Sequence, residues 1–201
     1  MTWRRGLYVI TDGGPDLPGR VAAAIAGGAV LVQYRDKGDD GDRRRSEAAA
    51  LRSVCREGGV PLVINDDVAL AAEVGADGVH LGRDDAAVAS ARERLGPGAV
   101  IGASCYDDLE TARAARAAGA DYLAFGSFFP SATKANPARP SPDLLGRAKA
   151  ELGVPVAAIG GITPDNGAAL VAAGADLLAV VSGVFGADDV AAAARRYAAL
   201  F

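Results

Sequence analysis

The sequence has 201 residues, of which 50% are hydrophobic and 23% are charged, with a formal net charge of −4 and an isoelectric point near 5.0. A chain of this length can bury one sizeable core, and we expect residues 1–201 to form a single domain. The acidic balance argues against a general nucleic-acid binder, which would carry a basic face.

Three features bear on where the protein works. The N-terminal residues lead straight into an apolar strand, so we expect no signal peptide. No apolar run approaches the roughly 20 residues of a membrane span. Cys55 and Cys105 lie far apart and match no metal-binding spacing. We therefore expect a cytoplasmic protein with reduced thiols that binds neither nucleic acid nor membranes.

Short apolar runs alternate with alanine-rich segments of helical length along the whole chain. The candidate strands are 7–10, 31–34, 62–64, 78–81, 100–103, 122–125, 156–159 and 177–181. The candidate helices are 17–27, 42–57, 67–74, 85–95, 107–118, 141–151, 164–173 and 186–199. Continuous apolar strands in strict alternation with helices imply parallel β–α units. Eight units predict an α/β fold, a single-domain (β/α)8 TIM barrel, and an open doubly wound sheet is the alternative.

A repeated tripeptide strengthens the barrel prediction. Gly-Ala-Asp precedes an apolar run at 75–77, 119–121 and 174–176, and Gly28-Ala29 is a degenerate form of the same signal. These turns precede the second, fourth, sixth and eighth strands, so the repeating unit is two β–α pairs, a quarter of a barrel. Glycine after an alanine-rich helix is the expected left-handed cap. The repeat therefore concerns architecture and indicates no chemistry.

Acidic and amide side chains follow the third and fourth runs. Asn65, Asp66 and Asp67 end one strand, and Asp84 and Asp85 follow the next. The active sites of such barrels lie at this end of the strands, and carboxylates gathered there repel one another unless a cation joins them. Mg²⁺ commonly uses one or two carboxylates together with substrate phosphates. The alternative is that these acids cap the following helices.

Polar residues alternate along the second run. Gln33, Arg35 and Lys37 would point to one side, where cationic groups need a partner to offset their desolvation. An anionic ligand with several oxygens would supply it. The alternative is a structural network of arginine with Asp36 or with an acid from the next strand.

Two glycine-containing turns suggest a second anion site. They are residues 160–163 after the seventh run and 181–183 after the eighth. Barrels often bind phosphate at these two loops through backbone N–H groups, which glycine allows to approach closely.

A long loop starts after the sixth run, at residue 126. Loops of this length are usually functional or mobile. Ser131, Thr133 and Lys134 offer two hydroxyls and one ammonium group, which suit phosphate oxygens. The alternative is a solvent loop with incidental polarity.

Two potentially reactive side chains lie on strands. His80 is the only histidine, and its place in the fourth run favours a hydrogen-bonded structural role over general-base catalysis. Cys105 follows the fifth run with no visible base beside it, so a cysteine nucleophile is not expected.

Taken together, these segments resemble the thiamine phosphate synthase family over nearly the whole chain. The resemblance rests on LYVITD, VQYRDK, VPLVINDD, GADGVHLGRDD, GASCYD, GADYLAFGSFFPSATK, VPVAAIGGITPDN and LLAVVSG, all in the family's order. It implies a (β/α)8 barrel and a transferase with small-molecule substrates. Such an enzyme joins 4-amino-2-methyl-5-hydroxymethylpyrimidine diphosphate to a thiazole ethyl phosphate, forming thiamine phosphate and releasing pyrophosphate.

The resemblance also implies roles for individual residues. Asp66 and Asp85 would bind the Mg²⁺ cofactor. The pyrimidine diphosphate would contact Gln33, Arg35, Lys37, Asn65, Ser104 and Lys134, and Arg35, Lys37, Ser104 and Lys134 of this set would be catalytic. The thiazole phosphate would contact Ser131, Ala132, Thr133, Gly161, Val181 and Ser182. Two departures from the family, Arg83 in place of a common Gln and the pair Cys105-Tyr106, put local contacts in doubt and leave the reaction itself intact.

Two other functions stay open. A thiazole tautomerase would share the barrel and the thiazole phosphate site but has no use for a diphosphate-bound Mg²⁺. A non-catalytic sensor of thiamine precursors could lose the metal carboxylates without losing ligand binding. Asp66, Asp85 and the Ser-x-Thr-Lys segment favour the synthase. The sequence leaves open whether the protein is a homo-oligomer.

Overall fold

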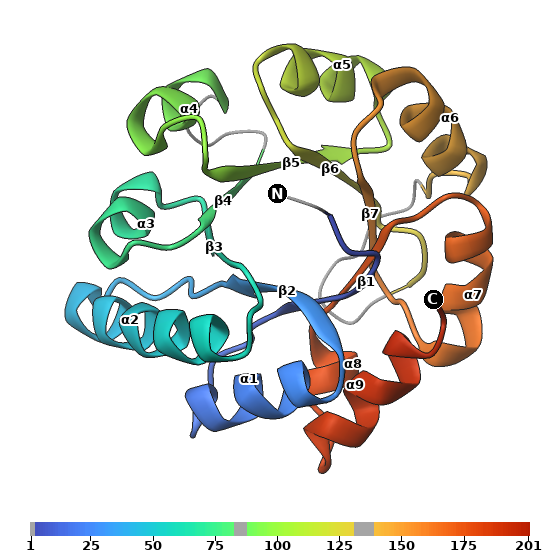
Figure 1. Ribbon diagram of the computed structural model, residues 1–201. Helices are drawn as coiled ribbons and strands as arrows, with labels where there is room; N and C mark the ends of the chain where they lie inside the picture. Colours follow the sequence, from blue (N-terminus) through green and yellow to red (C-terminus); the bar gives the residue numbers. More distant parts are fainter. Residues whose placement is uncertain (1–2, 83–87, 131–138) are drawn as a thin grey trace.

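The computed structural model describes residues 3–82, 88–130 and 139–201. Within these ranges, eight parallel strands pair in chain order and close into a barrel that a ring of helices surrounds (Figure 1). The strands are β1 (Gly6–Ile10), β2 (Ala29–Tyr34), β3 (Leu62–Asn65), β4 (Gly78–Leu81), β5 (Val100–Tyr106), β6 (Tyr122–Phe125), β7 (Val156–Ile159) and β8 (Leu177–Val180). The predicted TIM barrel is confirmed, and the open-sheet alternative is wrong because β1 also pairs with β8.

A helix follows each strand, and two helices follow β8. They are α1 (Leu17–Ala26), α2 (Gly41–Glu57), α3 (Val68–Val74), α4 (Val88–Leu95), α5 (Leu109–Ala117), α6 (Asp143–Leu152), α7 (Pro164–Ala172), α8 (Ser182–Phe185) and α9 (Val190–Ala198). No helix in the described ranges is long and apolar enough to cross a membrane.

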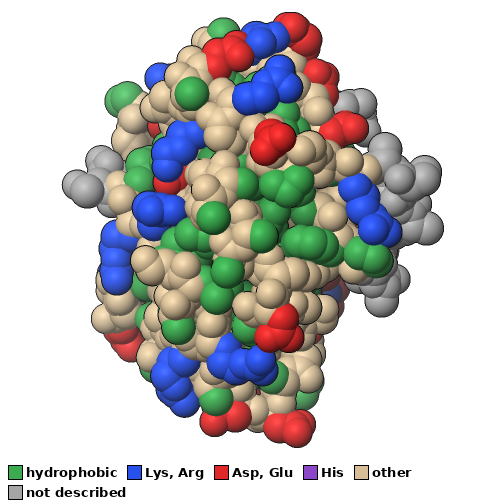
Figure 2. Space-filling model, turned by 90° about the vertical axis from the view of Figure 1, so that its right-hand side faces the viewer, with side chains coloured by type: hydrophobic (Ala, Val, Ile, Leu, Met, Phe, Trp, Pro, Cys, Tyr) green, Lys and Arg blue, Asp and Glu red, His purple; other side chains and the backbone are tan. Residues whose placement is uncertain are grey.

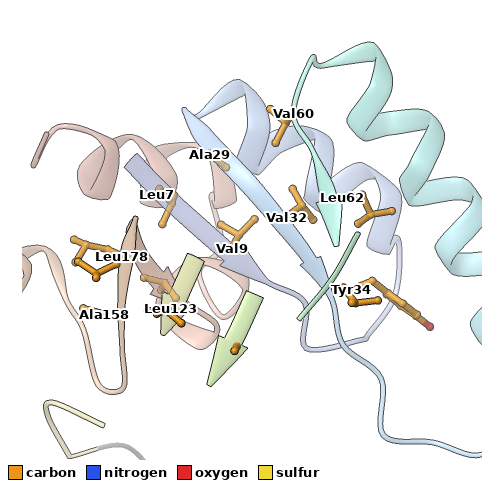
Figure 3. Close-up of a cluster of buried hydrophobic side chains, with 14 of the residues drawn as sticks. Leu7, Val9, Ala29, Val32, Tyr34, Val60, Leu62, Leu123, Ala158 and Leu178 are labelled. Carbon is orange, nitrogen blue, oxygen red and sulfur yellow. The ribbon is translucent and has the colours of Figure 1, made fainter. Parts of the chain in front are cut away.

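Strand alternation sorts the buried side chains into two layers. Leu7, Val9, Val32 and Leu62 point outward and pack between the strands and the helices, as Figure 3 shows. The interior of the barrel holds a second cluster, in which Tyr8, Ile10, Leu31, Val63, Tyr122 and Leu177 meet. This alternation decides which strand residues can reach a ligand at the mouth of the barrel.

Two elements differ from the sequence prediction. The helix expected at 186–199 is observed as α9, which begins only at Val190 because Asp189 caps it through Ala192 N at 2.8 Å, and the short helix α8 before it was not expected. The fifth strand continues past residue 103 to Tyr106, with an irregularity between Ser104 and Tyr106 in its pairing with β6.

The Gly-Ala-Asp repeat has one structural role throughout. The aspartate carboxylate accepts a backbone amide at the start of the preceding strand, from Leu62 to Asp77 (2.8 Å), Ile101 to Asp121 (2.8 Å) and Val156 to Asp176 (3.1 Å). A basic side chain pairs with each carboxylate, namely Arg52, Arg92 and Lys149. The repeat therefore joins the starts of neighbouring strands, at the end of the barrel opposite the predicted active site.

The surface carries interspersed charges of both signs. Figure 2 shows this on the face that lies to the right in Figure 1, where α6 and α7 lie. In Figure 1 the N-terminal segment lies across one end of the barrel, where Trp3 packs edge-on against Tyr122 with ring centroids 5.4 Å apart.

Candidate active site

A hollow of about 460 Å³ opens at the carboxyl ends of β2 and β3. It is lined by Asp36, Lys37, Gly38, Arg44, Asn65, Asp66 and Asp67. The structure thus brings Lys37, from the polar group predicted after the second strand, together with Asn65 and Asp66, predicted after the third. This is the end of a (β/α)8 barrel where active sites lie.

Asp66 adopts an unusual backbone conformation directly after β3. Its φ is 64°, in the left-handed region that Asp and Asn tolerate better than most other residues. The side-chain amide of Asn65 donates to Oδ2 of Asp66 at 2.5 Å, and the Gly82 backbone amide donates to Oδ1 at 3.3 Å. The carboxylate is therefore held between the ends of β3 and β4 while it lines the hollow.

Asp67, by contrast, serves the following helix. Its Oδ1 accepts the Leu70 amide at 2.8 Å as the N-cap of α3, and its Oδ2 accepts a hydrogen bond from Arg44 at 2.9 Å. The capping alternative is thus confirmed for Asp67, which separates it from Asp66.

The side chains of Arg35 and Lys37, after β2, have no acidic partner among the described residues. Asp36 pairs with Arg43 of α2 instead, and that hydrogen bond lowers the pKa of Asp36. Asp36 thus belongs to an arginine network through Arg43, but Arg35 takes no part in the alternative network with Asp36 or with an acid from the next strand among the described residues.

Thr11, at the end of β1, fixes the backbone of Arg35. Its hydroxyl accepts from the Arg35 amide at 2.9 Å and donates to the Arg35 carbonyl at 3.3 Å. This exchange orients the chain just where β2 ends, while Lys37, two residues on, lies in the hollow. These two hydrogen bonds therefore fix the backbone from which the Arg35 side chain projects.

A hydrogen-bonded polar cluster lies inside the barrel below this mouth. Gln33 is 2% exposed and donates through Nε2 to the Tyr8 hydroxyl. His80 bonds Tyr122 through Nδ1 at 2.8 Å and Ser104 through Nε2 at 2.9 Å. The hydrogen-bonded role expected for His80 is confirmed, and Gln33 and Ser104 are both placed on inward-facing strand positions.

Cys105 faces away from this interior. It belongs to the cluster between the strands and the helices, and burial raises the pKa of its thiol to about 12. A thiolate at neutral pH is therefore disfavoured, so the surroundings of Cys105 do not favour a cysteine nucleophile. Cys55 is likewise buried, and both cysteines are free.

The glycines of the loop after β7 allow the loop after β6 to pack closely against it. Gly161 has φ 62°, and a Cβ there would lie 2.3 Å from the carbonyl oxygen of Pro130. Phe129, in the loop after β6, donates its backbone amide to the Gly160 carbonyl at 3.0 Å. Glycine is needed here because two loops meet, a reason that the sequence alone did not reveal.

The loop after β8 is short and leads into a single helical turn. Val181 precedes α8, and Ser182 is its first residue. Arg20 of α1 donates to the Phe185 carbonyl at 2.5 Å and to the Gly13 carbonyl at 2.6 Å. The turn is therefore fastened to the loop after β1.

Several residues singled out in the sequence lie outside the described residues. They are the predicted site residues Asp85, Ser131, Ala132, Thr133 and Lys134, together with Arg83 and Asp84. Among the described residues, no group of three or more His, Cys, Asp or Glu side chains could hold a metal ion. A site with one or two carboxylates, such as Mg²⁺ uses with substrate phosphates, does not require such a group.

Sequence reasoning missed Arg44, Tyr8 and Tyr122. Arg44 lines the hollow, and its Nε is buried with no hydrogen-bond partner in the described structure. Its place in the first turn of the helix after β2 could have pointed to it, since this turn lies at the active end of a barrel. Tyr8 and Tyr122 were hidden inside apolar runs, where only the inward parity of their positions distinguishes them.

A larger hollow of about 850 Å³ lies at the opposite end of the barrel. Its lining includes the last turns of α2, α3 and α4 and the residues that lead into β3 and β5. Since active sites in this fold lie at the other face, this hollow is not the candidate active site.

Comparisons with known proteins agree with the geometry. A sequence profile of the family described as "Thiamine monophosphate synthase" matches residues 7–184. The chain is 53% identical to a thiamine-phosphate synthase of Thiobacillus denitrificans, covering 100% of this chain and 96% of that protein. A second such synthase, of Chromobacterium violaceum, is 55% identical over 98% and 96% of the two chains.

A solved structure gives the same result at the level of the fold. The thiamine phosphate pyrophosphorylase of Pyrococcus furiosus superposes with a TM-score of 0.87 at 36% identity, over 97% of this chain and 94% of that one. Profile, sequence relatives and structural neighbour cover nearly the whole chain. The chain belongs to the thiamine monophosphate synthase family.

Proposed function

We propose that the protein joins an aminopyrimidine methyl diphosphate to a thiazole ethyl phosphate, giving thiamine phosphate and pyrophosphate. The observation that carries this proposal is the meeting of Lys37, which forms no ion pair among the described residues, with Asn65 and Asp66 in one hollow at the barrel mouth. Cations left without protein anions suit a polyanionic substrate, and the carboxylate suits its metal counter-ion.

The task of the side chains is to stabilise a departing anion. Breaking the carbon–oxygen bond leaves a pyrimidinylmethyl cation, which the ring amino group stabilises, and free pyrophosphate. Arg35, Lys37 and Lys134 supply positive charge to the leaving group, and Ser104 adds a hydroxyl contact. The thiazole nitrogen attacks with its own lone pair, so no general base is needed. This accounts for a site with cations and hydroxyls in which the single histidine is engaged in hydrogen bonds.

Asp66 and Asp85 would hold Mg²⁺. The Asp66 carboxylate fits this role because it lines the hollow beside Asn65, and the Asp67 carboxylate is committed to capping and to Arg44. The bound ion would supply charge neutralisation for the diphosphate oxygens. Asn65 orients Asp66 through its side-chain amide and would also contact the pyrimidine.

The thiazole phosphate would bind on the other side of the mouth. Backbone groups of Gly161, after β7, and of Val181 and Ser182, after β8, would contact it. Ser131, Ala132 and Thr133 of the loop after β6 complete the set. Holding the two substrates together lowers the barrier by removing the entropy cost of their encounter.

The two alternative functions lack comparable support. The relatives described above carry the names thiamine-phosphate synthase or thiamine phosphate pyrophosphorylase, and none of them is a tautomerase or a sensor. A precursor sensor also has no need of the predicted metal carboxylates, which it could lose without losing ligand binding.

One assay separates the three functions. Purified protein is incubated with both precursors and Mg²⁺, and thiamine phosphate and pyrophosphate are measured separately. We expect equal amounts of both products and none when either precursor is omitted. Isomerisation of the thiazole without condensation would replace this proposal with a tautomerase. Binding of both precursors without any turnover would replace it with a sensor.

A further inference from the structure

Five inward-facing residues from five strands form a continuous hydrogen-bonded chain across the barrel. Gln33 (β2) bonds Tyr8 (β1), and the hydroxyls of Tyr8 and Tyr122 (β6) lie 2.9 Å apart. Tyr122 bonds His80 (β4) at 2.8 Å, and His80 bonds Ser104 (β5) at 2.9 Å. The chain thus begins and ends at two residues assigned to the pyrimidine diphosphate and passes between them through three residues with no assigned role.

With Gln33 oriented to donate through Nε2, the hydrogens in this chain run in one direction. Because Gln33 donates through Nε2, the Tyr8 oxygen accepts, and its own hydrogen has Tyr122 as its acceptor. The hydrogen of Tyr122 then goes to Nδ1 of His80. A reversed order would leave the Tyr8 hydrogen without an acceptor in the described structure, which is costly inside a protein.

The direction of the hydrogens sets the hydrogen-bonding roles of Gln33 and Ser104 at the two ends of the chain. With Nδ1 as acceptor, the neutral imidazole of His80 carries its hydrogen on Nε2 and donates it to the Ser104 oxygen. The hydroxyl hydrogen of Ser104 is then left to donate to a ligand. At the other end, the Gln33 carbonyl oxygen, which accepts no hydrogen bond among the described residues, is left to accept from one.

This hydrogen-bonded chain, from here on the relay, is rigid, and its two phenols stay protonated. Burial raises the pKa of both Tyr8 and Tyr122 well above that of free tyrosine, so each phenol carries one hydrogen at neutral pH. The Tyr8 and Tyr122 rings meet edge to face with centroids 5.9 Å apart, and His80 stacks on Tyr122. Gly102 makes room for Tyr122, since a Cβ there would lie 2.0 Å from the ring.

We propose that Tyr8, Tyr122 and His80 act as positioning residues whose one-way relay fixes Gln33 as an acceptor and Ser104 as a donor, and so selects the aminopyrimidine ring of the substrate. The amino group of that ring donates, whereas its ring nitrogens and the attached phosphate oxygens accept. A pyrimidine with an oxo group in place of the amino group would set one acceptor, the oxo oxygen, against another, the Gln33 carbonyl oxygen. This proposal rests on the proposed function for the identity of the ligand.

The direction of the relay can be observed at His80. It is the only histidine, so the ring signals of ¹⁵N-histidine-labelled protein need no assignment. We expect the Nε2–H tautomer, with Nδ1 shifted as a hydrogen-bonded acceptor, at pH 8 in the wild type. The variant Tyr122→Phe removes the donor to Nδ1 and should give a mixture of tautomers. A wild-type ring with its hydrogen on Nδ1 would overturn the proposal.

The selectivity is tested with a matched pair of unreactive ligands. Both carry a carbon–carbon bond in place of the carbon–oxygen bond to the diphosphate; one has the amino ring and the other the oxo ring. Calorimetric titration gives the ratio of their dissociation constants, and this ratio does not depend on the folded fraction of a variant. We expect Tyr8→Phe and Tyr122→Phe to reduce the wild-type preference for the amino ring by at least about fivefold, the equivalent of one lost hydrogen bond.

Tyr34→Phe is the matched control. Tyr34 is also a buried strand tyrosine, but its hydroxyl faces α2 and bonds Glu47 at 2.7 Å. We expect its ratio to stay within twofold of the wild type. Unchanged ratios in Tyr8→Phe and Tyr122→Phe, with the wild type still preferring the amino ring, would reject the relay and leave the proposed function intact. Failure of the wild type to bind the amino ligand would reject the proposed function instead.

Discussion

The backbone amide of Gly82, at the end of β4, donates to the carboxylate of Asp66, at the end of β3, across 3.3 Å. The bond spans the two strands that the sequence suggested as a metal site. It holds a carboxylate whose own backbone is in the left-handed region, which Asn adopts about as readily as Asp.

Asp66→Asn should therefore leave the fold intact and remove most of the activity. The amide keeps the backbone conformation but loses the charge needed for a hard divalent cation. We expect kcat to fall at least about 100-fold, with the thermal midpoint within about 3 °C of the wild type. Asp67→Asn is the control: Asn also caps helices, so its kcat should stay within about threefold. Equal losses in both variants would contradict the separation of these two neighbours.

The metal dependence can be measured directly. Turnover should vanish in excess chelator and return when Mg²⁺ or a similar divalent ion is added. Asp85→Asn should cripple turnover as Asp66→Asn does while the circular dichroism spectrum stays unchanged. Full turnover in chelator, or wild-type rates in Asp85→Asn, would remove the metal assignment.

Arg35 should matter for the pyrimidine diphosphate alone. Its side chain forms no ion pair in the described structure, so Arg35→Gln removes a positive charge without breaking an ion pair among the described residues. We expect kcat/KM for this substrate to fall at least about 50-fold, and the KM for the thiazole phosphate to change less than threefold. Arg56→Gln, in the hollow at the opposite end of the barrel, is the control and should have no effect.

Gly161→Ala should impair the phosphate loops. The new Cβ would meet the Pro130 carbonyl, so the loops after β6 and β7 would have to part. We expect the KM for the thiazole phosphate to rise about tenfold. Gly153→Ala is a close control because Gly153 has φ 64° and a Cβ added there would meet nothing within 4 Å. It should cost about 1 kcal/mol of stability from backbone strain and leave this KM unchanged. A normal KM in Gly161→Ala would show that the loop contact is dispensable.

Stability should decline in alkaline solution. Burial raises the pKa of the Cys55 and Cys105 thiols to about 12, above their values in an unfolded chain. Their contribution to the free energy of unfolding is therefore complete below about pH 8.5 and is lost as the pH rises toward 12. Denaturant titrations at pH 7, 9 and 10.5 should show this fall. Cys105→Ala should flatten it, and an identical slope in that variant would contradict the assignment to this thiol.

The fold followed from local patterns because each strand and helix carries its own signal. The apolar runs ended close to the observed strand ends, and the three aspartates of the repeat marked strand starts correctly. The short helix α8 was missed because its four residues are too few to carry a helical pattern, and the late start of α9 depends on the cap that Asp189 supplies.

The candidate site was predictable only in part. The polar residues after β2 and β3 could be placed at one mouth once the strand count was known. The residues Tyr8 and Tyr122 could not, because their hydroxyls meet across the barrel from strands that are 114 residues apart in sequence. Gly161 was linked to phosphate, whereas its contact with Pro130 depends on a loop path that no local pattern encodes.

Hydrogen bonds from a strand-start amide to the aspartate of a Gly-Ala-Asp turn are present in three quarters of the barrel and missing from one. In the first quarter Val30 stands where the other three have aspartate, and the pairing of β1 with β2 is irregular between Leu7 and Tyr8. The base of the seam between these two strands therefore lacks the carboxylate hydrogen bond that the other three quarters have. These two strands also carry Tyr8 and Gln33. We expect hydrogen exchange to be fastest, among the strand amides, at the start of β1 and β2, below the proposed pyrimidine site.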